Sequence, residues 1–309
     1  METIERIETT HLHGYAYANV KFPDPVTWTL GVAFDDFEQD PIKVNRVSPK
    51  LGVRWDMTRD LSLRGAVFRW IKPALSANRT LEPTQVSGFD QVFDDVNGDE
   101  SWRYGVGLDW RATGELFAGA EATWRDINVP FTFFGDAVFE PWKEQLHRAY
   151  LFWTPTSQLS LSAQVVYDTF EAEPGILTSF FTTPLSVRTF SVPLEARYFD
   201  PSGFFAGVGV TFVDQEVVRC EIPKDPEDPP CLGLSDGADQ FSVVDLAIGW
   251  RFPKRMGIAS LSINNLFNEN FHYQDDSFRE FRDEPTSGPY TPGIKVVGRV
   301  TLDLGALSD

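Results

Sequence analysis

Residues that could carry out chemistry are few in this sequence and lie far apart. The chain has four histidines, His11, His13, His147 and His272. No Ser and Asp lie at a spacing from them that is typical of a hydrolase relay. Asp275 and Asp276 lie near His272 in an expected loop, where an acid pair could serve hydrolysis, although solvated loop charge is the simpler interpretation. The sequence therefore favours a protein that is not an enzyme.

One short stretch resembles a cation loop. Asp95, Asn97 and Asp99 have the one-three-five spacing of calcium ligands. The glycine of this stretch stands at the fourth place instead of the sixth, and no Glu stands at the twelfth. Two hypotheses stay open, a Ca²⁺ site and a hydrophilic turn before a strand that begins at Trp102, and the turn is favoured. No other cofactor is expected.

The chain has two cysteines, Cys220 and Cys231, which flank the Pro-rich acidic run EIPKDPEDPP. A pair that closes a short loop of this kind favours a disulfide in an oxidising compartment. The alternative is two free thiols. No further Cys or His residues gather around the pair, so a zinc site is not expected there.

The balance of charge limits the partners. Acidic side chains outnumber basic ones, 45 against 27, and the formal net charge is −18. Nucleic acid is excluded as a partner, because a phosphate backbone requires Lys and Arg on one face. Aromatic residues make up 14% of the chain, which calls for a large core or for apolar surroundings on the surface.

No run approaches the 18 apolar residues of a transmembrane helix. Strands that alternate apolar and polar residues can still cross a membrane at low mean hydropathy. Residues 1–10 lack the basic and apolar regions of a signal peptide. We therefore expect a fragment, or a mature form, of an exported protein.

The elements that position these residues are predicted to be strands. In the range 102–111, Trp102, Tyr104 and Val106 alternate with Arg103 and Gly105, so successive side chains face opposite sides. The same alternation predicts about 13 strands, at 11–22, 26–35, 50–56, 61–71, 102–111, 116–128, 145–154, 159–171, 187–199, 204–217, 239–252, 258–267 and 295–304.

Short turns and long loops alternate between these strands. The long loops are expected near 36–49, 72–101, 129–144, 172–186, 218–238 and 268–293. Such alternation is typical of an antiparallel up-and-down transmembrane β-barrel, with short periplasmic turns and long outer loops. The fold class is therefore predicted as all-β, with a single barrel domain over residues 1–309. A soluble β-sandwich is the alternative.

Two further patterns bear on the barrel. Trp and Tyr residues often lie near expected strand ends, as in an interfacial belt: Trp28, Trp55, Trp70, Trp102, Trp110, Trp153, Tyr198 and Trp250. The alternation in the range 61–71 fails at Phe68 and Trp70, and we expect a β-bulge there.

Many charges fall on the polar side of the expected strands and would face the barrel interior. They are Arg54, Arg64, Arg103, Asp109, Arg111, Glu121, Arg125, Asp168, Glu195, Arg197, Asp245, Arg251, Arg299 and Asp303. A lone buried charge is costly, so we expect cross-strand ion pairs or contact with water.

The C-terminal region resembles a known family. The run IASLSINNLFNENFHYQD contains Asn265, Leu266, Phe267 and Asn268, and it resembles the penultimate strand of TonB-dependent receptors. Pro292-Gly293, before the last strand, and the Leu-Glu-Pro run 81–83 are similar to the family at matching places. The chain departs from the family at its end, LDLGALSD, where the last strand usually closes on an aromatic residue.

The resemblance implies a 22-stranded barrel with an N-terminal plug, so that about nine strands, the plug and the energy-coupling segment would precede this sequence. It also implies a Gram-negative outer-membrane location, lipid as a partner and a TonB-type coupling complex. The activity implied is import of a scarce nutrient, a small molecule bound by the loops near 72–101, 218–238 and 268–293. The alternatives are a passive or export pore with periplasmic repeats upstream, an adhesin, and an outer-membrane enzyme.

Overall fold

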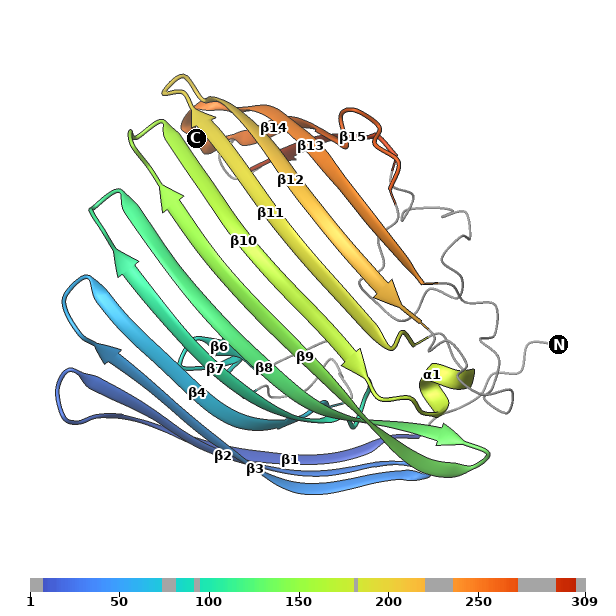
Figure 1. Ribbon diagram of the computed structural model, residues 1–309. Helices are drawn as coiled ribbons and strands as arrows, with labels where there is room; N and C mark the ends of the chain where they lie inside the picture. Colours follow the sequence, from blue (N-terminus) through green and yellow to red (C-terminus); the bar gives the residue numbers. More distant parts are fainter. Residues whose placement is uncertain are drawn as a thin grey trace. The chain divides into compact units, whose positions relative to one another are not determined.

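The computed structural model describes residues 8–73, 82–91, 95–180, 183–219, 236–271 and 293–303. Thirteen of its strands form one antiparallel sheet, in which the strands lie side by side in chain order (Figure 1). The predicted all-β, up-and-down arrangement is therefore confirmed. Within the described residues β1 and β15 are the edges of this sheet. No described helix is long and apolar enough to cross a membrane.

The strands of the sheet are β1 (Thr10–Lys21), β2 (Val26–Gln39), β3 (Ile42–Asp56), β4 (Leu61–Ile71), β7 (Glu100–Arg111), β8 (Leu116–Phe133), β9 (Asp136–Trp153), β10 (Leu159–Ala172), β11 (Ser186–Phe199), β12 (Phe204–Val218), β13 (Gly237–Arg251), β14 (Gly257–Asn264) and β15 (Lys295–Leu302). Between β4 and β7, the short strands β5 (Gln85–Val86) and β6 (Phe89–Asp90) pair with each other. A short helix, α1 (Ile176–Phe180), follows β10, and a 3₁₀ turn (Pro253–Arg255) follows β13.

The chain divides into two compact units. Unit 1 comprises Met1–Asp109, Glu121–His147 and Thr169–Thr178, and unit 2 comprises Trp110–Ala120, Arg148–Asp168 and Ser179–Asp309. The single domain expected over residues 1–309 stays a prediction.

The predictions of two long loops are wrong. The range 36–49 belongs mostly to β2 and β3, which are separated by Asp40 and Pro41 alone. The range 129–144 likewise belongs to β8 and β9. Here Phe134 and Gly135 form the turn, and both have positive φ, 48° and 91°, as a two-residue hairpin of this type requires. At these two places the alternation of short and long connections does not hold.

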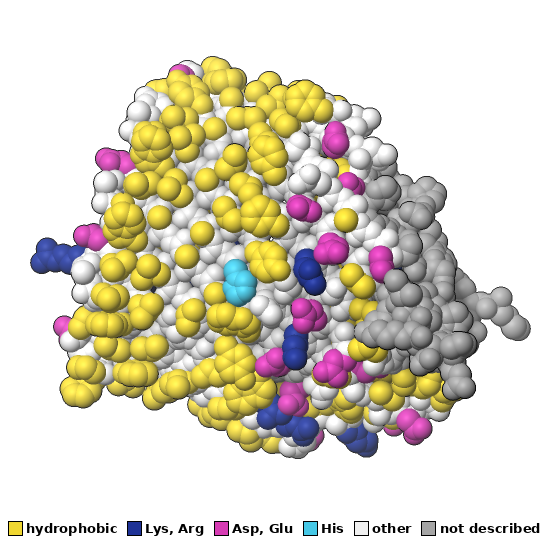
Figure 2. All heavy atoms as spheres, in the orientation of Figure 1, with side chains coloured by type: hydrophobic (Ala, Val, Ile, Leu, Met, Phe, Trp, Pro, Cys, Tyr) yellow, Lys and Arg dark blue, Asp and Glu magenta, His cyan; other side chains and the backbone are white. Residues whose placement is uncertain are grey.

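One face of the sheet carries many exposed apolar side chains, such as Leu30, Val106 and Ile248. It is termed the apolar face, and its reverse the polar face. In Figure 2, hydrophobic side chains cover much of the left part of the visible surface, and charged ones gather to the right of them. Five strands carry an aromatic residue, 42–50% exposed, at the end that leads into a short turn: Trp55, Trp110, Trp153, Tyr198 and Trp250.

Some strands are longer in the structure than the sequence predicts, and a change of polarity along β2 explains the difference. Phe34 and Asp36 share the apolar face, so that this face changes there from apolar to charged. On the polar face, Asp35 is followed by Phe37, and both side chains are buried. On β3 the register partners repeat the change, because Val47 is opposite Phe34 and Asn45 is opposite Asp36. A single alternating pattern cannot describe such a strand.

The prediction of a β-bulge in the range 61–71 is wrong. β3 and β4 pair in continuous register from Lys50–Phe68 to Asp56–Ser62. Phe68 and Trp70 do lie on the polar face, but both are buried. Phe68 packs there with Val86 and Phe89. Because this contact covers the ring, no bulge is needed to turn Phe68 to the apolar face. Trp70 is accordingly not part of an exposed aromatic belt.

The cover over Phe68 is the inserted hairpin, residues 82–91, which contains β5 and β6. It lies close against the polar face of unit 1. A Cβ atom on Gly52 would come within 2.2 Å of Ser87 Oγ, and one on Gly105 within 2.6 Å of Phe89. These two glycines therefore make room for the hairpin. Part of the loop predicted at 72–101 thus packs onto the sheet.

Candidate functional site

The first cluster on the polar face of unit 1 is centred on Arg64. Its Nε donates to Asp109 Oδ2 at 2.7 Å, and its Nη2 donates to Glu121 Oε2 at 3.3 Å. The same guanidinium lies 4.9 Å from the centroid of the Phe89 ring and donates to the carbonyl of Gly88. Arg64 therefore links β4 to β7 and β8 and also holds the inserted hairpin in place.

A second cluster is centred on Arg125 and includes the residues predicted as a calcium loop. Arg125 donates to Glu144 Oε2 at 2.6 Å and to Asp95 Oδ2 at 2.5 Å. Asp99 Oδ2 lies 3.9 Å from the same guanidinium, and Asn97 lies in the intervening turn. Burial, together with the nearby Asp95 carboxylate, raises the pKa of Asp99 to about 8. Arg125 already supplies positive charge to these acids, and calcium binding stays a prediction.

Arg103 links β7 and β8 to the inserted hairpin. It is 6% exposed, donates to the carbonyl of Asp90 at 3.1 Å and donates to Thr123 Oγ1 at 3.2 Å. The predicted charges Arg103, Asp109, Glu121 and Arg125 therefore lie within a continuous polar layer of unit 1. Such a layer fixes the relative positions of neighbouring strands and of the inserted hairpin.

The structure also brings together His11, His13 and Asp35, which sequence reasoning did not associate. His11 Nε2 lies 2.9 Å and His13 Nδ1 lies 2.7 Å from Asp35 Oδ1. The three side chains are 7%, 10% and 2% exposed. The His-x-His spacing within an expected strand was the available signal, because it places both rings on one face. Asp35 is the register partner of His13 on the next strand, which only strand pairing reveals.

Other polar groups surround this histidine cluster. Lys50 Nζ lies 2.9 Å from Gln91 Oε1 and 3.5 Å from Glu82 Oε1. Tyr17 donates its hydroxyl proton to Glu82 Oε2. The other oxygen, Glu82 Oε1, is buried without a hydrogen-bond partner and lies 3.9 Å from His13 Nε2. The inserted hairpin thus brings a carboxylate to the histidines.

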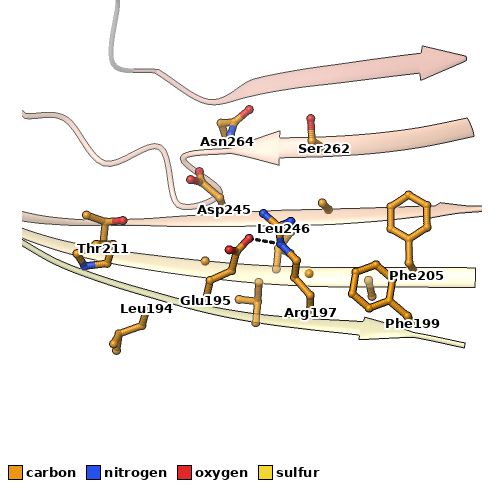
Figure 3. A pocket seen from close by; sticks show the side chains of 16 residues that line it. Leu194, Glu195, Arg197, Phe199, Phe205, Thr211, Asp245, Leu246, Ser262 and Asn264 are labelled. Atoms are coloured by element: carbon orange, nitrogen blue, oxygen red, sulfur yellow. Dashed lines mark hydrogen bonds and ion pairs between the residues drawn. The ribbon is translucent and has the colours of Figure 1, made fainter. Parts of the chain in front are cut away.

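In unit 2, a pocket of about 500 Å³ opens beside β11, β12 and β13 (Figure 3). Arg197 Nε donates to Glu195 Oε1 at 2.5 Å within it. Phe199 and Phe205 lie near one another at one end of the lining, with ring centroids 6.4 Å apart. The Glu195 and Arg197 side chains are 40% and 57% exposed. Because of this exposure, their ion pair can open, and each side chain can then bind a polar ligand or water instead.

The Asn-Leu-Phe-Asn motif forms the turn after β14. Asn265 and Asn268 both have positive φ, 52° and 53°, which Asn tolerates better than most residues. The backbone N–H of Asn265 donates to Asp245 Oδ1 at 2.8 Å, and its side chain makes two hydrogen bonds with the backbone of Glu269. Asn268 Oδ1 accepts from Ile294 N–H just before β15. In this structure the motif holds neighbouring strands together.

The remaining predicted residues are dispersed. Arg251 lies 5.5 Å from the centroid of the Phe199 ring, and Arg111, Arg299 and Asp303 are exposed. Cys220 and Cys231, predicted as a disulfide, lie outside the described residues, as do His272, Asp275 and Asp276.

The sequence does contain one Gly-x-Ser-x-Gly pattern, at 233–237. A nucleophile elbow joins a strand to a helix, whereas Gly237 begins the strand β13. Residues 233–235 of the pattern lie outside the described residues.

A long antiparallel sheet with an apolar face, a charged polar face and aromatic strand ends defines the wall of a membrane β-barrel. Residues 3–266 match the family model described as TonB dependent receptor-like, beta-barrel, and the chain belongs to this family. This confirms the family predicted from the sequence. Comparison with curated protein sequences gives no match.

Solved structures with the same fold are similar over nearly the whole chain. The FrpB iron transporter from Neisseria meningitidis (F5-1 variant) has a TM-score of 0.65 and 18% identity, and the match covers 94% of this chain and 45% of that one. The siderophore receptor PirA from Acinetobacter baumannii gives 0.62 and 13%, with 95% and 46% covered. The ferripyoverdine receptor of Pseudomonas aeruginosa gives 0.57 and 15%, with 89% and 36% covered. The chain thus spans less than half the length of these proteins.

Proposed function

We propose that the protein acts in the Gram-negative outer membrane as a receptor that binds a ferric siderophore and imports it. Family membership and the iron and siderophore transport named for similar structures support this substrate class. The observation that carries the membrane location is the apolar face, with its band of exposed Leu, Val, Ile and Phe side chains and its aromatic strand ends.

The polar face suits the interior of such a receptor. Its buried arginines are held by carboxylates and carbonyls, so the wall is polar and rigid. In this proposal, import is driven by a TonB-type coupling complex acting through a plug region, as in the family. Recognition falls to the outer loops near 72–101, 218–238 and 268–293.

Growth under iron limitation tests the function. A strain that lacks the gene is supplied with single ferric siderophores of the catecholate, hydroxamate or mixed type, and with ferric citrate as a control. We expect loss of growth on one siderophore class and rescue by the full-length gene. Rescue is expected to fail with a gene that lacks residues 272–292. Unchanged growth on every siderophore, with no quenching of tryptophan fluorescence in the purified protein, would refute the proposal.

The membrane location has its own test. A closed barrel resists unfolding by detergent until it is boiled, so the full-length protein is expected in the outer-membrane fraction with heat-modifiable migration on a gel. Recovery of the protein in the soluble periplasmic fraction would contradict the location without reference to any ligand.

A further inference from the structure

We propose that His11, His13 and Asp35 form a binding site for a divalent transition-metal cation of the zinc, nickel or cobalt type. The site lies on the polar face of β1 and β2, near the level at which the apolar face becomes charged. It is a property of the chain itself and does not depend on siderophore import.

The donor set carries the first part of the inference. Two imidazoles and one carboxylate are a recurrent set of three protein ligands, with further positions left for water or another ligand. One nitrogen of each ring and one oxygen of Asp35 lie within 4.8 Å of one another. Ligand atoms on a common cation, each at about 2.1 Å, stand about 3.0–3.4 Å apart. Small rotations of the two rings satisfy this spacing.

The strand geometry carries the second part. His11 and His13 alternate with Leu12, so both rings project from the same face of β1. Asp35 is directly opposite His13 in the register of β1 and β2. The positions of all three ligands are thus fixed by regular backbone, and rigid elements hold a metal site more accurately than loops do.

Glu82 supplies an outer partner. His13 meets Asp35 through Nδ1, and its Nε2 lies 3.9 Å from Glu82 Oε1, a buried oxygen that also pairs with Lys50. If Nδ1 binds the cation, the ring proton resides on Nε2, where a carboxylate can accept it. Metal-bound histidines commonly donate their second N–H in this way, which fixes the ring and strengthens the ligand.

The charge of the cluster favours a cation. Asp35 and Glu82 carry two negative charges and Lys50 carries one positive charge, so with neutral imidazoles the sum is −1. Without a cation the two rings share one carboxylate oxygen. The simpler alternative is a hydrogen-bonded network with no affinity for metal, and the experiment separates the two.

Cobalt titration is the direct test. Tag-free full-length protein in detergent micelles is titrated with Co²⁺, and the visible absorption of the bound ion is recorded. We expect one Co²⁺ per chain at the cluster, at least 100-fold weaker binding in His13→Ala and Asp35→Asn, and binding about 10- to 100-fold weaker in Glu82→Gln. His147→Ala, a histidine beside Trp124 outside the cluster, is the matched control and should bind as the native protein does.

Absence of the Co²⁺ absorption, or equal binding by His13→Ala and the native protein, would overturn the proposal. If the variants fail to fold, the native protein still gives an answer. Zn²⁺ is expected to protect His11 and His13, but not His147, from acylation by diethylpyrocarbonate, as read by mass spectrometry. Equal modification with and without Zn²⁺ would also overturn it.

Discussion

Phe34 and Asp36 project from the same face of β2, two residues apart, and the chemical nature of that face changes between them. The change recurs in register on β3, at Val47 and Asn45. A limit shared by neighbouring strands is expected where a membrane ends, since lipid and water each select the side chains that face them.

A charge placed on either side of this limit should have unequal effects. Leu30→Arg puts a guanidinium on the apolar face and is expected to lower the free energy of unfolding in lipid vesicles by about 2–4 kcal/mol. The matched control Asp36→Arg, beyond the limit, is expected to cost about 0–1 kcal/mol. Urea-induced unfolding followed by tryptophan fluorescence gives both values. Equal effects would show that lipid does not end between Phe34 and Asp36.

Removal of Arg64 should destabilise the protein strongly. Arg64→Ala leaves Asp109 and Glu121 without the guanidinium that bridges them, and the expected loss is about 3 kcal/mol, typical of a broken buried ion pair. Arg197→Ala, which breaks the exposed pair with Glu195, should cost less than about 1 kcal/mol. Denaturant titration of both variants decides, and a larger loss in Arg197→Ala would contradict the assigned burial.

The raised pKa of Asp99 predicts a pH dependence. The folded protein keeps the Asp99 proton up to about pH 8, whereas the unfolded chain releases it near 3.8, so the stability contributed by this group falls as pH rises between these values. Asp99→Asn should therefore exceed the native protein in stability at pH 8, on the order of a few kcal/mol, and the gain should shrink toward pH 4.

The control for Asp99 is its neighbour Asp95. Asp95→Asn removes a carboxylate that accepts from Arg125 at 2.5 Å, so this variant is expected to be less stable than the native protein at pH 8. Unfolding midpoints in urea at pH 4, 6 and 8 report both effects. A lower midpoint for Asp99→Asn at pH 8 would be the contrary result.

The turn after β14 should depend on Asn265 in two separable ways. Asn265→Gly keeps the positive φ but loses two hydrogen bonds to Glu269, for about 1–2 kcal/mol. Asn265→Val loses the same bonds and adds backbone strain, since a β-branched residue disfavours positive φ. Thermal unfolding should rank the native protein above the Gly variant and the Gly variant above Val. Equal melting temperatures of the Gly and Val variants would show that the positive φ of residue 265 does not affect stability.

The sequence predicts most of the sheet because alternation shows directly which side of a strand is apolar and which is polar. It fails at the ends of β2, β3, β8 and β9, where the alternating pattern of apolar and polar residues changes along one strand. It also fails at Phe68, whose burial depends on the inserted hairpin, a partner distant in the chain.

The site was less predictable than the fold. The charges of β7 and β8 are visible as the polar half of an alternating strand, but their partners depend on register. His11 and His13 are visible as a pair, whereas Asp35 joins them only through the pairing of β1 with β2, and Glu82 only through the fold of the inserted hairpin. A single sequence does not show which residues of neighbouring strands lie opposite each other.

The hairpin of β2 and β3 has an immunological consequence. Apart from the turn at Asp40 and Pro41, residues 36–49 lie in regular strands, with Phe37, Ile42 and Val44 buried. A free peptide of this sequence displays every side chain, whereas the folded hairpin buries Phe37, Ile42, Val44 and Ser48. Antibodies raised against the peptide should therefore recognise denatured protein far better than folded protein.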